Sequence, residues 1–165
     1  MISIVKGPVE RFIRKSCLSA AVCNLALNPA LAWLGDREMT EHPLCPSILI
    51  DTGMTCLAMS LLIALFVSAD VGRALRSGAI GTAEPPPRHP GWLSRLPARP
   101  WRLGVALGGI LALVILPCLA IVFGALGISS LSFASFALFK AVWTPVAAWI
   151  VARWAILRRL SIAAA

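Results

Sequence analysis

Two ionisable side chains, Asp51 and Lys140, stand within long apolar stretches of the sequence. A charge near the middle of a bilayer costs about 2.5–3.5 kcal/mol, so such residues pair with one another or mark the site of a solute. Side chains in a helix lean toward its N-terminus, which brings Lys140 toward the level of Asp51. We therefore predict a contact between them, which either fixes the packing of two helices or forms part of a binding site.

Uncharged polar residues lie one helical turn from each other or from this pair, at Asn24, Asn28, Thr55 and Thr144. Residues four apart share one face of a helix, so these side chains are expected to point the same way as their neighbours. We expect them to join Asp51 and Lys140 in an intramembrane polar cluster. Such a cluster either binds a ligand or holds helices together, through hydrogen bonds worth about 0.6–2 kcal/mol each.

The residue patterns of common catalytic and cofactor sites are missing from the sequence. Both histidines, His42 and His89, lie outside the apolar stretches, which excludes a haem with two histidine ligands inside a bundle. The five cysteines form no Cys-x-x-Cys pair, and no phosphate-binding loop or hydrolase motif occurs. His42 and Cys45 are spaced for a metal, but two ligands make a poor site. We expect no enzyme activity, no cofactor and no metal.

Four apolar segments must position the polar residues, at 18–34, 48–69, 103–128 and 133–157. Each has close to the roughly 20 residues that a helix needs to cross about 30 Å of hydrocarbon. A soluble domain of 165 residues could not bury a chain that is 59% hydrophobic and only 13% charged. Short links at 35–47 and 129–132 join the segments in pairs. The predicted fold is therefore an all-α, four-helix transmembrane bundle built from two antiparallel helical hairpins.

Basic residues gather in three regions: an arm at 1–17, a loop at 70–102 and a tail that begins at 158 and ends at 165. The first link has Arg37 as its one cation and the second has none. The excess of positive charge on one side predicts that both termini are cytoplasmic. A membrane surface accounts for the net charge of +8, so no nucleic-acid partner is expected. An alternative is that the first segment, with Ala30-Leu31-Ala32, is a cleaved signal peptide.

The loop at 70–102 is rich in proline and glycine, which favours an extended, solvated linker. Its end alternates tryptophan and arginine, at Trp92, Arg95, Arg99, Trp101 and Arg102. Indole rings favour the headgroup level and arginines bind phosphates, so we predict that these residues contact lipid headgroups. A docking segment for a cytoplasmic partner is the alternative interpretation.

Gly104 and Gly108 give the third segment a face of small residues, which allows close helix contact within the bundle or with a partner. Prolines interrupt three of the four segments, at Pro29, Pro117 and Pro145. Each proline leaves a backbone carbonyl that needs another donor.

Three stretches carry a resemblance to known sequences: Asn24-x3-Asn28-x4-Trp33, Asp51-Thr52, and Ser132-Phe133-x2-Phe136-x2-Phe139-Lys140. The pattern resembles small four-span bacterial membrane proteins that are mostly described as hypothetical or permease-like. The resemblance covers the spans and not the central loop. It implies a protein of the bacterial inner membrane and carries over no activity or site residue.

Two functions fit the sequence. The first is a non-enzymatic accessory or scaffolding subunit, whose partners are the lipid bilayer and another membrane protein or a second copy. The second is a small oligomeric transporter or channel-like protein in which Asp51 and Lys140 form the polar site.

Overall fold

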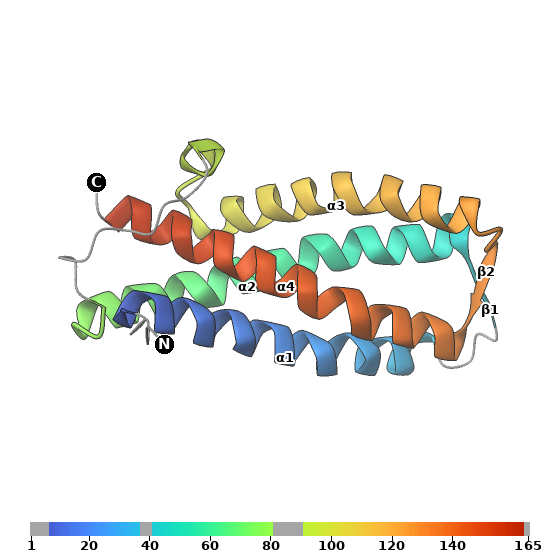
Figure 1. Ribbon diagram of the computed structural model, residues 1–165, viewed down its shortest axis with the longest axis horizontal. Coiled ribbons are helices and arrows are strands. Elements are labelled where there is room, and N and C mark those ends of the chain that lie inside the picture. Colours follow the sequence, from blue (N-terminus) through green and yellow to red (C-terminus); the bar gives the residue numbers. More distant parts are fainter. Residues whose placement is uncertain (1–6, 37–40, 81–90, 164–165) are drawn as a thin grey trace, which may run out of the picture.

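The computed structural model describes residues 7–36, 41–80 and 91–163. It contains four long helices, α1 (Pro8–Asp36), α2 (Leu49–Arg76), α3 (Pro100–Ala125) and α4 (Phe133–Ala163), as Figure 1 shows. All four are long and apolar enough to cross a membrane, so the chain is a multi-pass membrane protein. The predicted all-α, four-helix bundle is confirmed.

The helices extend beyond the predicted apolar segments. The arm expected at 1–17 is helical from Pro8 onward, α2 continues to Arg76, and α4 continues to Ala163. Hydropathy marks only the part of a helix that lies in hydrocarbon, whereas backbone hydrogen bonding continues into the polar region. The added turn of α1 also contributes to the core, because Val9 and Ile13 are buried.

The two helices joined by a short link are not the ones that pack most closely together. α1 lies along α4, α2 lies along α3, and α2 also contacts α4. α1 and α2 are thus joined by a short link without packing closely along their length. This arrangement leaves an open face between α1 and α2 and another on the outer side of α3.

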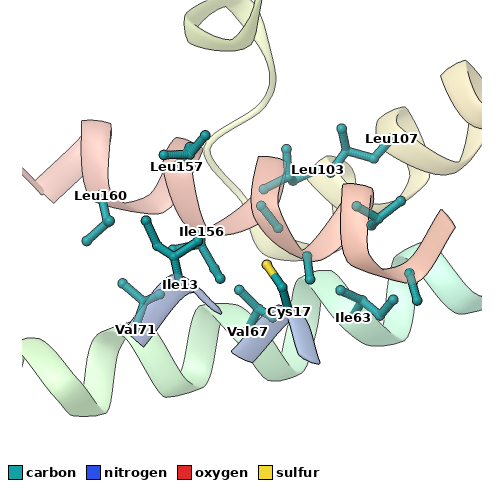
Figure 2. Packing of buried hydrophobic residues seen from close by; sticks show 14 of the residues in the cluster. Ile13, Cys17, Ile63, Val67, Val71, Leu103, Leu107, Ile156, Leu157 and Leu160 are labelled. Atoms are coloured by element: carbon teal, nitrogen blue, oxygen red, sulfur yellow. The ribbon is translucent and has the colours of Figure 1, made fainter. Parts of the chain in front are cut away.

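The main core fills the half of the bundle that holds the chain termini. Figure 2 shows Cys17 from α1, Val67 from α2 and Ile156 from α4 meeting there, with Leu103 from α3 beside them. A smaller cluster of Ala32, Ile48 and Phe136 lies toward the two links. All four helices therefore contribute to burying apolar surface in the main core.

The two links pair with each other at the far end of the bundle. Strands β1 (Glu41–Pro43) and β2 (Ser130–Ser132) are antiparallel, with His42 opposite Leu131. A π-helical turn, η1 (Leu44–Ile48), leads into α2. The pairing satisfies backbone groups of both links and joins the two helical hairpins where no covalent connection does.

The end of the central loop is folded onto α4, which differs from the extended linker expected there. The 3-10 turn η2 (Gly91–Arg95) buries Leu93 completely. Arg158 donates from Nε and Nη2 to the carbonyl of Leu96 at 2.9 and 2.7 Å, and the ring of Trp92 meets Trp154 edge-on. A short turn can be held in this way because two N–H groups of one arginine donate to the carbonyl of the residue that follows the turn. Residues 81–90 of the loop lie outside the described residues.

Candidate functional site

Lys140 and Asp51 form an ion pair within the bundle. The Lys140 Nζ lies 2.8 Å from the Asp51 Oδ1 and donates a hydrogen bond to it. Lys140 is 4% exposed as a residue, while the Asp51 side chain is 30% exposed. The carboxylate lies in the first turn of α2, where the helix dipole favours a negative charge. The predicted contact is thus present, and it joins α2 to α4.

Aromatic rings cover the ammonium on the side of the links. The Lys140 Nζ lies 5.1 Å from the centre of the Phe136 ring, within the range of a cation–π interaction. His42 stacks on Phe136 with 4.5 Å between ring centres and is 1% exposed. These rings lie between the ammonium and the two links, and they replace part of the water that the ammonium loses.

The position of Phe136 beside Lys140 could be predicted from the sequence, whereas that of His42 could not. Phe136 precedes Lys140 by one turn, so helical spacing alone places its ring beside the ammonium. His42 reaches this place only because β1 pairs with β2, and no local pattern indicates that pairing. His42 therefore was not among the residues expected in the polar cluster.

The other predicted polar residues form a second group, centred on α1. The Asn28 Nδ2 donates to the Asn24 Oδ1 at 2.9 Å, and the Asn24 Nδ2 donates to the carbonyl of Ala20 at 2.8 Å. The Thr144 hydroxyl donates to the carbonyl of Lys140 at 2.7 Å and lies 3.4 Å from that of Asn24. Thr144 therefore connects the two groups through backbone atoms.

Thr55 contributes least to the predicted cluster. It is half-buried on α2, and within residues 7–36, 41–80 and 91–163 no side-chain hydrogen bond involves it. The neighbouring Thr52 is fully buried instead. One helical turn of spacing was therefore enough to predict a shared face but not which threonine is enclosed.

Several buried polar atoms near the ion pair have no partner among the described residues: Asp51 Oδ2, Thr52 Oγ1 and His42 Nε2. A buried acceptor or donor without a partner costs about 1–3 kcal/mol. The second carboxylate oxygen and the hydroxyl one residue away could therefore hold a water molecule, a proton or a small cation. The described residues contain no group of three or more His, Cys, Asp or Glu side chains that could hold a metal ion.

The two predicted packing glycines face α2. A Cβ on Gly104 would lie 2.6 Å from the Leu61 Cα, and one on Gly108 would lie 2.9 Å from the Leu57 Cα. Both distances are too short for any side chain, so the close approach of α2 and α3 requires glycine at both positions. These glycines are therefore used within the chain.

The residues predicted to contact headgroups are all exposed at the end of the bundle that holds the termini: Trp92, Arg95, Arg99, Trp101 and Arg102. The Arg102 guanidinium lies 5.0 Å from the centre of the Trp101 ring. Because the turn that carries Trp92 and Arg95 is fixed on α4, these side chains form a surface of defined shape.

No protein-family model matches the chain, and no curated protein or solved structure is significantly similar to it.

Proposed function

We propose that the protein is a non-enzymatic accessory subunit that binds another integral membrane protein through the outer face of α3. The observation that carries this proposal is the position of two further glycines, Gly109 and Gly124. A Cβ at either position would meet no heavy atom within 4 Å in the described part of the chain. Gly109 lies in the interior of α3, where glycine is about 1 kcal/mol less favourable than alanine, and Gly124 lies in its last turn. Packing among the described residues does not account for either glycine.

The same face of α3 has two further features that suit a partner helix. Ala120 and Gly124 are exposed and four residues apart, the spacing at which small residues allow two membrane helices to approach closely. Pro117 is also exposed and offers no N–H to the carbonyl of Leu113, a residue that is itself 77% exposed. A polar side chain on a partner helix would satisfy that carbonyl in a region without water.

The test is recovery of the partner from membranes with leucine placed on this face. We expect Gly109→Leu and Gly124→Leu to reduce co-purification of the partner in a mild detergent by about tenfold, equivalent to about 1.4 kcal/mol. The matched control is Ala58→Leu, which puts the same side chain on an exposed position of α2. Unchanged recovery in both glycine variants, with normal folded yield, would contradict the proposal.

A transporter or channel-like protein is the second candidate, supported by the unpartnered Asp51 Oδ2 and Thr52 Oγ1 beside Lys140. Four spans seldom enclose a pathway alone, so this function would need self-association. Under this function Asp51→Asn abolishes solute flux in proteoliposomes while the folded yield is largely kept, because the amide oxygen can still accept from Lys140. Under the accessory function there is no flux to lose.

A further inference from the structure

An open groove runs between α1 and α2, where these helices do not pack closely. Its volume is about 570 Å³. Its walls are mostly apolar and include Leu27, Leu62 and Phe66, which are 57%, 53% and 69% exposed as residues. Side chains this exposed on membrane-spanning helices face hydrocarbon, so the groove opens sideways into the bilayer.

The groove has the length of one leaflet. Phe12, Lys15 and Asp70 line it at the end that holds the termini, and Leu27 and Met59 line it at the other end. The fifteen residues from Phe12 to Leu27 rise about 22 Å at about 1.5 Å each. Half of a bilayer of about 40–45 Å, headgroup regions included, is about 20–22 Å. The groove therefore runs from headgroup level to near the middle of the membrane, as an acyl chain does.

The mouth of the groove carries a cation that suits a phosphate. Asp70 is paired with Arg73 at 3.1 Å, which offsets its negative charge. Lys15 has no ion pair among residues 7–36, 41–80 and 91–163, and Arg11 and Arg14 are exposed on the neighbouring turn. The net charge around the mouth is positive, so an anionic headgroup is favoured over a zwitterionic one.

The polar side chain at the deep end of the groove already has hydrogen-bond partners within the protein and needs no water. Asn24 lines it, but its amide nitrogen donates to the carbonyl of Ala20 and its amide oxygen accepts from Asn28. An apolar chain can therefore lie against Asn24 without leaving that amide unsatisfied.

We infer that the groove binds one anionic glycerophospholipid, with an acyl chain between α1 and α2 and its phosphate on Lys15. This site lies on a different part of the bundle from the outer face of α3, and it stands whether or not the accessory function holds. The occupant is a lipid of the leaflet that surrounds Arg11 and Arg14.

The headgroup contact is tested by native mass spectrometry of the full chain with added phosphatidylglycerol or phosphatidylcholine. We expect Lys15→Gln to weaken phosphatidylglycerol binding about fivefold and phosphatidylcholine binding less, because the choline cation offsets the charge of the phosphate that Lys15 contacts. The matched control is Arg14→Gln, which removes a cation from the same turn outside the groove lining and should change binding less than Lys15→Gln. Equal effects of the two variants would show a general surface charge and overturn the site.

The acyl-chain contact is tested by filling the groove. Cys23 is exposed and lines it, whereas Cys118 is exposed on α3. We expect Cys23→Trp to reduce retention of both lipids and Cys118→Trp to leave it unchanged, with both variants folded as judged by helicity and elution volume. Unchanged lipid retention in Cys23→Trp would overturn the inference. If Cys23→Trp instead lost a co-purified protein, the groove would bind a partner helix, and the inference of a lipid site would be overturned as well.

Discussion

At the scale of single residues, the ion pair shows what an apolar sequence can reveal. Asp51 and Lys140 were predictable because a charge inside a span has few possible partners, and each is the other's counter-charge. In a soluble protein, water could solvate either charge, and the two residues would not need to pair. His42 was not predictable, since its burial over Phe136 depends on backbone pairing with Leu131 in the other link, 89 residues further along the chain.

The worth of the pair can be measured by a double-mutant cycle. We expect Asp51→Ala to lower the free energy of unfolding by about 3–5 kcal/mol, because it leaves a buried ammonium without its counter-charge. Adding Lys140→Met should restore stability to near that of the wild type. Thermal unfolding in a mild detergent gives both values.

Asp70→Ala is the control for this cycle. Asp70 forms an exposed pair with Arg73 three residues away, and losing it should cost less than about 1 kcal/mol. Equal losses for Asp51→Ala and Asp70→Ala would mean that burial of the first pair has no energetic consequence.

At the scale of elements, the sequence predicted four helices but not which helices pack together. Hydropathy records how apolar a segment is. Its value does not depend on which other helices the segment packs against. The close packing of α2 on α3 depends on Gly104 and Gly108, a pattern that the sequence shows but that fits a partner helix as well. Only the structure distinguishes these inner glycines from the outer Gly109.

The two kinds of glycine should respond oppositely to alanine. In Gly104→Ala the new methyl group meets the backbone of α2, so the helices must separate, and we expect a loss of about 1–3 kcal/mol. In Gly109→Ala nothing obstructs the methyl group, and better helix propensity should add up to about 1 kcal/mol. Unfolding of both variants in detergent provides the comparison. A loss in Gly109→Ala equal to that in Gly104→Ala would contradict the assignment of faces.

At the scale of the whole molecule, the first turn of α1 and the last turn of α4 lie at one end and the paired links at the other, as Figure 1 shows. Basic residues gather at the first end, so we expect it to be cytoplasmic. The sequence was sufficient for this expectation because it depends on counting charges. It was insufficient for the folded turn at Gly91–Arg95, because the prolines of the surrounding loop suggested a linker and the attachment of the turn depends on Arg158.

Native cysteines report this orientation. Cys45 is exposed near the paired links, whereas Cys17 and Cys56 are fully buried. We expect a membrane-impermeant maleimide to label Cys45 in spheroplasts, since the links would then face outward, and the label should disappear in Cys45→Ser. Labelling that requires inside-out vesicles would reverse the orientation.

The pairing of β1 with β2 also limits how the hairpins can slide past one another. A shift of one residue in a two-stranded ribbon turns every side chain to the opposite face. Such a slip would move His42 away from its buried place against Phe136. The ribbon therefore sets the axial alignment of α2 relative to α4, and that alignment holds the carboxylate and the amine at one depth.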